Sequence, residues 1–245
     1  MEKKKSKFYK FLKKIVRCFY GKRKFIQLEN IPSSPSIIVG NHSQAHGPLV
    51  AELLFPLPKE TWCIGEMMSR KEIPDYAMKD FFPYKKKSSL WFYKIISRLI
   101  ARPFAFIFSN ADCIGVYKDA RVMSTFKQSI SALKDGKHLI IYPECHTKYN
   151  EIINQFQLNF IDVARMYYKN TGVELDFVPM YIAPKLKTVV FGKPIKYDHT
   201  LPAEQQKLRV SEYLKEQITA LAKSLPTHTV VPFDNIAKKD YSKSK

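Results

Sequence analysis

The stretch Ser36-Ile37-Ile38-Val39-Gly40-Asn41-His42 decides the fold prediction, because it is a short apolar run that ends in polar residues. The run follows two prolines and predicts a buried strand. Helical spacing resumes at Pro48, whose fixed φ and missing N–H suit the first turn of a helix, so we expect Gly47 to be the N-cap. His42 is therefore expected between a strand and a helix, where open α/β sheets expose reactive groups.

The same alternation of strand and helix continues along the chain. Apolar runs predict strands at 113–117, 138–142, 177–183 and 188–191, and helical spacing predicts helices at 120–134, 156–168 and 205–225. This order predicts an α/β fold with a mostly parallel central sheet flanked by helices. We expect three parts: a basic amphipathic helix region over 1–30, the α/β domain over 31–230 and a basic C-terminal tail over 231–245.

Two segments combine an apolar stripe with basic residues, as helices at a membrane surface do. The first stripe lies within 3–24 and consists of Phe8, Phe11, Leu12, Ile15, Phe19 and Tyr20. The second lies within 90–100 and is expected to end near Pro103, with Lys94, Arg98 and Arg102 on its opposite face. Each helix has a second interpretation, in which its apolar side packs on the protein's own core.

The net charge indicates which classes of partner the protein can bind. Lys and Arg outnumber Asp and Glu by 41 to 22, which predicts a polyanionic partner, either nucleic acid or anionic lipid. The positive charge lies where the apolar stripes lie, and the sequence has no recognition-helix, zinc-finger or aromatic RNA-binding signature. We therefore expect an anionic membrane surface as partner and no nucleic acid.

The location follows from cysteine usage and hydrophobicity. The four cysteines form no CxxC pair, so neither a zinc site nor a disulfide framework is predicted, and a reducing setting fits best. No uninterrupted apolar run of 18 residues occurs, and the lysine-rich start lacks the features of a secretion signal. We expect a peripheral protein at the cytoplasmic face of the cell membrane.

Two clusters carry residues suited to catalysis. A neutral imidazole at His42 can act as general base, which is typically worth about 10² to 10⁴ in rate, whereas the alternative is a turn histidine bonded to backbone. The second cluster follows a predicted strand and can bind phosphate; it comprises Tyr142, Pro143, Glu144, Cys145, His146, Thr147 and Lys148. A thiol nucleophile at Cys145 is the less favoured alternative, because adjacent side chains seldom face each other.

These residues resemble conserved blocks of the 1-acylglycerol-3-phosphate acyltransferase family. Asn41-His42, four residues and then Gly47-Pro48 resemble the NH-x4-D block, and Ile141-Tyr142-Pro143-Glu144 resembles the start of the FPEGTR block. Three further resemblances follow in the family's order: Ile114 to Lys118, Phe177-Val178-Pro179-Met180 after Phe156, and Gly192-Lys193-Pro194-Ile195. Together they cover roughly 31–197.

The resemblance implies an acyltransferase that uses no metal or cofactor. It would move a fatty acyl group from an acyl carrier protein or coenzyme A thioester to the hydroxyl of a lysophospholipid such as 1-acylglycerol-3-phosphate. His42 would be the base, Glu144 would shape the catalytic site, and Lys118 would stand where the family's arginine contacts the acceptor phosphate. The other residues expected to bind substrate are Asn41, His46, Gly47, Arg121, Cys145, His146, Thr147 and Lys148, and a further expectation is that Asn41 helps to hold the loop.

Two departures from the family pattern leave alternatives open. Gly47 stands where the family has the aspartate that orients the histidine; loss of such a carboxylate in Ser-His-Asp enzymes lowers turnover about 10⁴-fold. Either Glu144 or a water orients the ring instead, or His46 shares the proton relay, or the site is silent and the chain binds lipid or acyl carrier protein. Cys145-His146-Thr147 replaces Gly-Thr-Arg, so Lys148, His146 or Arg121 would bind the phosphate.

Overall fold

The computed structural model describes residues 5–80, 90–145, 152–234 and 236–245. The chain forms two compact units, each built from two stretches of sequence. Unit 1 comprises Met1–Phe19 and Trp62–Lys127, and unit 2 comprises Tyr20–Thr61 and Gln128–Lys245. The three expected parts, 1–30, 31–230 and 231–245, stay a prediction.

Unit 2 contains the larger part of the sheet. Its strands run in the order β1-β7-β6-β2-β5-β3, with β8 beside β6. The strands are β1 (Lys24–Ile26), β2 (Ser36–Gly40), β3 (Lys59–Ile64), β5 (His138–Ile141), β6 (Asp176–Ala183), β7 (Thr188–Phe191) and β8 (Ile195–Lys196). The helices are α2 (His46–Leu53), α6 (Asp162–Thr171), α7 (Ala203–Ser224) and the short η1 (Leu28–Asn30), η4 (Leu158–Ile161), η5 (Pro184–Leu186) and η6 (Lys238–Asp240).

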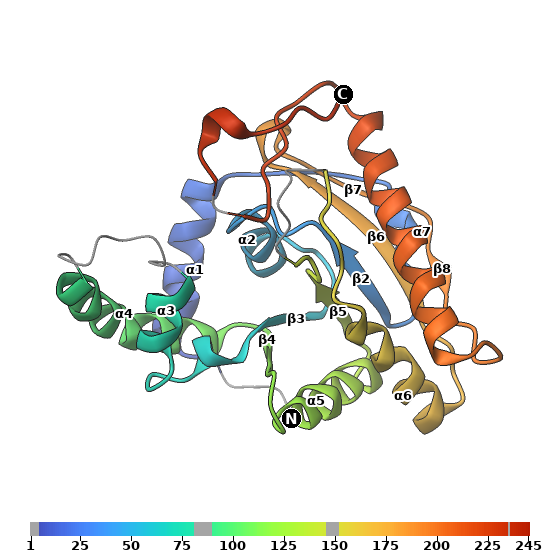
Figure 1. The fold of residues 1–245 in the computed structure, drawn as a ribbon, viewed down its shortest axis with the longest axis horizontal. Helices are drawn as coiled ribbons and strands as arrows, with labels where there is room; N and C mark the ends of the chain where they lie inside the picture. The colour runs from blue at the N-terminus through green and yellow to red at the C-terminus, as the bar shows by residue number, and fades with distance from the viewer. Residues whose placement is uncertain (1–4, 81–89, 146–151, 235) are drawn as a thin grey trace. The chain divides into compact units, whose positions relative to one another are not determined.

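The α/β fold with a mostly parallel sheet is confirmed. β2 pairs in parallel with β5 and β6, while β7 and β8 pair with β6 in the antiparallel direction. β2 lies between two neighbours and is buried along its whole length, which explains its continuous apolar sequence. α7 packs along β6, as Figure 1 shows in orange. The core of unit 2 gathers side chains from several strands and α2, among them Ile38, Val50, Ile140, Met180 and Phe191.

Unit 1 is mostly helical. It contains η2 (Gly65–Met68), α3 (Ile73–Asp80), α4 (Leu90–Asn110) and β4 (Cys113–Val116). It also contains α1 (Lys7–Tyr20) as far as Phe19 and α5 (Val122–Lys134) as far as Lys127, because the boundaries between the units fall inside these two helices. β3 continues into this unit, where β4 is its neighbour. Its core comprises Met67, Ile73 and Ala101, against which Phe104 and Phe108 pack.

The expected end of the second basic helix near Pro103 is wrong. α4 runs through Pro103 and ends at Asn110. A proline inside a helix removes one hydrogen bond and crowds the preceding turn, at a cost of about 3 kcal/mol. Phe104, Ala105 and Phe108 lie beyond it and pack against the core of unit 1, so tertiary packing offsets the local cost.

The apolar stripes of α1 and α4 are largely exposed. On α1, Phe8 is 63% and Phe19 87% exposed, whereas the adjacent Tyr9 is 4% exposed and forms the packed side. On α4, Trp91 is 66% and Leu99 70% exposed. The interpretation in which these stripes pack on the protein's core therefore fails for these residues. Among the described residues, no helix has the length and hydrophobicity needed to cross a bilayer.

Candidate active site

Asn41 anchors the loop that follows β2 to the neighbouring strand β6. Its side chain is 2% exposed. The amide donates to the Ile182 carbonyl over 3.0 Å and accepts from the Ile182 N–H over 2.7 Å. Ser43 and Gln44 then adopt positive φ values of 47° and 54°, a conformation that costs a non-glycine residue about 1–3 kcal/mol. The bonds at Asn41 thus hold a strained loop, and its amide is engaged within the protein.

Glu144 joins this loop to the segment that follows β5. Its carboxylate is 5% exposed; Oε1 accepts from the backbone N–H of His42 over 2.6 Å, and Oε2 accepts from the backbone N–H of Asn154 over 3.0 Å. Burial raises the pKa of Glu144 to about 7; the two N–H donors oppose this shift and the charge of Asp234 adds to it. Glu144 therefore fixes the main chain of His42, and both of its oxygens are bonded to backbone.

The ring of His42 lies between two aromatic side chains. Tyr142 meets it edge-on with ring centroids 5.5 Å apart, and Phe233 does so at 5.4 Å. Such edge-to-face pairs are worth about 0.5–1.5 kcal/mol beyond the area they bury. Nδ1 is buried and has no hydrogen-bond partner within the described part of the chain. The ring-to-ring contacts of this imidazole are thus with Tyr142 and Phe233.

Burial sets the protonation state of His42. It lowers the pKa of the imidazole to about 4, and the backbone of Gln44 opposes the shift to a smaller extent. The ring is therefore neutral at pH 7, as a general base must be before it accepts a proton. The same low pKa makes the ring a weak base, so catalysis would require the imidazolium to be stabilised during the reaction.

Gly47 is a glycine because the backbone approaches too closely for a side chain. Its N–H donates to the His42 carbonyl over 3.0 Å, and its carbonyl accepts from the Tyr142 hydroxyl over 2.7 Å. A Cβ at position 47 would lie 2.6 Å from the His42 carbonyl oxygen and 3.0 Å from Cε1 of Tyr142. The N-cap of α2 is Ala45, so the expected N-cap role of Gly47 is wrong. The same packing leaves no room for an aspartate side chain at position 47.

The remaining predicted residues of unit 2 have other contacts. Nδ1 of His46 shares a hydrogen bond of 3.1 Å with the Tyr20 hydroxyl, and burial, then Arg23 and Lys185, lower the His46 pKa. The relay between His46 and His42 stays a prediction. The Cys145 thiol donates to the Gln155 carbonyl over 3.2 Å, which gives no support to a nucleophilic role. His146, Thr147 and Lys148 lie outside the described residues.

Lys118 and Arg121 belong to unit 1. Lys118 is exposed. The Arg121 guanidinium is bonded to Asp119 over 2.8 Å and to Glu72 over 2.9 Å, and it lies 4.1 Å from the centre of the Tyr117 ring. A phosphate at Arg121 would therefore compete with two carboxylates for the guanidinium.

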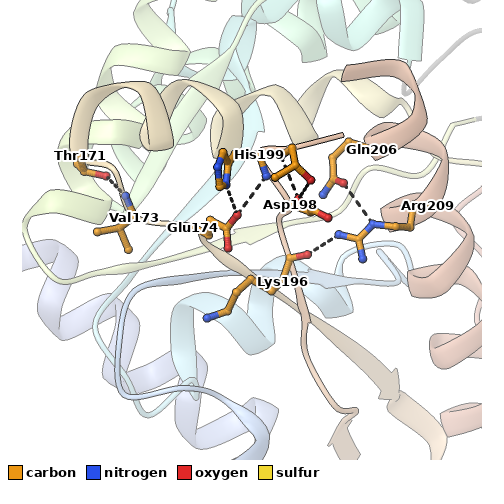
Figure 2. Close-up of polar contacts among 9 residues, drawn as sticks. Thr171, Val173, Glu174, Lys196, Asp198, His199, Gln206 and Arg209 are labelled. Carbon is orange, nitrogen blue, oxygen red and sulfur yellow. Dashed lines mark hydrogen bonds and ion pairs between the residues drawn. The ribbon is translucent and has the colours of Figure 1, made fainter. Parts of the chain in front are cut away.

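A cluster of possible metal ligands occurs elsewhere in unit 2. Figure 2 shows Glu174, Asp198 and His199, whose ligand atoms lie within 4.8 Å of one another. Nδ1 of His199 is already 2.7 Å from Glu174, and Asp198 accepts from the N–H and hydroxyl of Thr200. These mutual bonds account for the cluster without an ion.

A cavity of about 310 Å³ lies beside α7. That volume is near the lower limit of ordinary ligand pockets. Its lining does not include His42 or Glu144, and consists of Ile152, Ile153, Lys215, Thr219, Lys223, Ser242 and Lys243. The cavity is thus lined by residues other than those predicted for the acceptor site.

Sequence reasoning gave no role to Asn154 or Phe233, and it assigned Tyr142 only to the predicted phosphate-binding cluster. The structure places Tyr142 and Phe233 against His42, and Asn154 against Glu144. For Phe233 a signal was present, because Val230-Val231-Pro232-Phe233 is an apolar run in an otherwise lysine-rich C-terminal region. A run of this kind indicates a buried segment. No sequence pattern shows which loop it covers.

No protein-family model and no curated protein sequence matches the chain. Among solved structures, the 1-acyl-sn-glycerophosphate acyltransferase PlsC from Thermotoga maritima is similar with a TM-score of 0.46 and 16% sequence identity. The alignment covers 87% of this chain and 79% of the PlsC chain.

Proposed function

We propose that this chain is an O-acyltransferase that moves a fatty acyl group from a thioester to the hydroxyl of a lysophospholipid. The donor is acyl carrier protein or coenzyme A in thioester form, and the proposed acceptor is 1-acylglycerol-3-phosphate or a related lysophospholipid. The reaction takes place at the cytoplasmic face of the membrane and needs no metal or prosthetic group.

The hydrogen bond between the Glu144 carboxylate and the His42 N–H carries this proposal. It joins two short sequence blocks that resemble separate blocks of one acyltransferase family. The blocks follow β2 and β5, which are parallel neighbours, so both lie at the carboxyl edge of the sheet. Open α/β sheets gather reactive groups at this edge.

In the proposed reaction, Nε2 of His42 takes the proton of the acceptor hydroxyl while the hydroxyl oxygen attacks the thioester carbonyl carbon. The tetrahedral intermediate then expels the thiolate, which regains a proton from the imidazolium. One C–O bond forms and one C–S bond breaks. Base action through Nε2 requires the proton to be on Nδ1, and the neutral ring favoured by burial suits the first step.

The exposed stripes of α1 and α4 support the membrane part of the proposal. Phe8, Phe11 and Phe19 are exposed on α1, which also carries Lys7, Lys10, Lys13, Lys14 and Arg17. Aromatic side chains of this kind insert at the level of the lipid headgroups, while cationic side chains contact anionic lipids. A protein that uses lysolipid and fatty acyl substrates gains access to both at such a surface.

Mass spectrometry of the products formed from mixed lysolipids and acyl thioesters tests the proposal. The wild type is expected to acylate a phosphate-bearing lysolipid, and His42→Ala is expected to lose about 10² to 10⁴ in turnover. His199→Ala is the matched control, because His199 is an exposed histidine bonded to Glu174. Equal turnover in wild type and His42→Ala would remove His42 as the base.

A silent homologue that binds lipid or acyl carrier protein is the second candidate. It is favoured by the packing at Gly47, which leaves no room for an aspartate beside His42. This candidate predicts that an acyl thioester raises the melting temperature without product formation across a range of acceptors.

A further inference from the structure

Residues 226–234 and 236–245, called the C-terminal strap below, follow α7 in unit 2 (red in Figure 1). The two halves of the strap pair with each other: Thr229 and Lys243 form an antiparallel bridge, and the Val230 N–H donates to the Ser242 carbonyl over 3.0 Å. The buried His228 ring bonds the Tyr181 hydroxyl of β6 over 2.9 Å. The strap is therefore fixed to the sheet at its beginning.

The strap contacts Gln44 and His42 of the loop after β2. The amide of Gln44, one of the two residues of this loop with positive φ, donates to the Tyr241 hydroxyl over 2.8 Å. The ring of Phe233 stands at 85° to the His42 ring, with centroids 5.4 Å apart. Tyr142 contacts the same imidazole at 5.5 Å, so side chains from two different segments hold one ring.

We propose that Phe233 is a positioning residue, which acts with Tyr142 to hold the His42 ring in the orientation that another member of this fold would obtain from a carboxylate. This inference rests on the proposed function. Its physical basis is that Gly47 leaves no space for a side chain, and that Glu144 is bonded to the backbone of His42. Packing by two aromatic rings restricts the rotation of the imidazole in the absence of a side-chain carboxylate at position 47.

The strap also affects the pKa values of ionisable groups at the site. Asp234, next to Phe233, contributes to the raised pKa of Glu144. The titratable groups in contact with His42 are Tyr142, whose ring meets the imidazole, and Glu144, whose carboxyl accepts from the His42 N–H. For His42 itself, burial is the leading cause of the low pKa. Loss of the Phe233 ring should therefore hydrate the imidazole and raise its pKa from about 4 toward 6.5.

The experiment combines NMR titration of the His42 ring with kinetics of acyl transfer in the full chain. In Phe233→Ala, the titration midpoint is expected to rise and kcat to fall by about 10²-fold, the loss typical of a misplaced catalytic group, with KM less affected. Phe233→Tyr should restore both values. Phe25→Ala is the matched control, because Phe25 is partly buried and stacks on Phe191, away from the ring of His42.

The two readouts separate the two proposals. An unchanged His42 midpoint in Phe233→Ala would overturn the positioning role whatever the kinetics show. A rise in kcat would also overturn it, because it would mean that the strap blocks access to the His42 ring. If the His42 midpoint shifts in Phe233→Ala but the wild type makes no product, the acyltransferase proposal is refuted. The role of Phe233 in holding the His42 ring would then still stand. If Phe233→Ala does not fold, Phe233→Leu and Tyr241→Phe apply the same tests with smaller loss of packing.

Discussion

Aromatic side chains are exposed on the unit 1 helices α1 and α4, whereas they pack against the His42 ring in unit 2. On α1 and α4, Phe19 and Trp91 extend from the surface at 87% and 66% exposure. In the loop, Tyr142 and Phe233 close on one imidazole, and the backbone carbonyl of His42 stands against Gly47. The apolar stripes follow from the spacing of residues along a helix, whereas the loop depends on contacts between segments distant in sequence.

This difference in packing determines which substitutions each region tolerates. A substitution in an exposed stripe changes what the surface can bind and leaves the fold largely intact, because such side chains have few internal partners. A substitution in the loop affects a strained backbone, a buried carboxylate and a packed ring together. Three predictions below, ordered by the size of the expected effect, test this contrast.

The largest effect is expected for Gly47→Asp. The new Cβ would contact the His42 carbonyl, which belongs to the backbone, so the loop must move at a cost of about 3 kcal/mol. Gly136→Ala is the control: Gly136 has φ of 79° and open space around it, so strain alone should cost about 1–2 kcal/mol. Urea unfolding measures both. A stable Gly47→Asp with higher turnover would show that the loop accepts an aspartate at this position, which would contradict the contrast between the two regions.

A pH effect on stability of up to about 3 kcal/mol is expected from Glu144. The pKa is 4.5 in the unfolded chain and about 7 in the folded one, so the folded state retains the proton between these values. Its stabilising contribution is full below pH 4.5 and is lost as the pH rises through 7. His42, with its lowered pKa, acts in the opposite direction and loses its contribution as the pH falls from 6.5 toward 4.

Glu144→Gln isolates the first of these two effects. Denaturant unfolding at several pH values should show that the difference in free energy between wild type and variant shrinks as the pH rises from 5 toward 8. Glu174→Gln is a suitable control, since its carboxylate is bonded to His199 and its pKa is lowered. A difference independent of pH would mean that Glu144 titrates normally and is not buried as described.

The smallest effect per residue is expected for membrane binding. Replacing Phe11 or Phe19 by Ser should weaken binding to anionic vesicles by about 1–2 kcal/mol each, because each exposed ring loses its transfer into lipid. Melting temperatures should change little. Leu208→Ser is the matched control, an exposed apolar residue on α7 of unit 2. Sedimentation with vesicles at low and high salt checks this, since the apolar part should survive salt.

If Phe11→Ser and Phe19→Ser bind vesicles as the wild type does, the exposed stripe is not a lipid-binding surface. A gel shift with duplex DNA at the same salt then decides whether the net charge of +19 serves nucleic acid instead. Retention of vesicle binding only at low salt would indicate that lysines alone account for the association.

Much of the fold was predictable because buried parallel strands have continuous apolar sequences. β2 and β5 are buried at every residue, and both were found from their apolar runs. β3 was not found, because Lys59–Ile64 is buried only at alternate positions near its start and carries charged residues. The end of α4 was misplaced because packing beyond Pro103 outweighs a local rule.

The sequence alone determined the α/β class, the apolar stripes of the two basic helices and the two polar blocks that follow β2 and β5, because these depend on residue type and spacing; the exposure of the stripes was decided by the structure. Only the tertiary structure decided that Glu144 binds the backbone of His42, that Gly47 has no room for a side chain, and that Phe233 reaches the imidazole. These contacts join residues separated by up to nearly two hundred positions, and no local periodicity records which distant segment fills a given space.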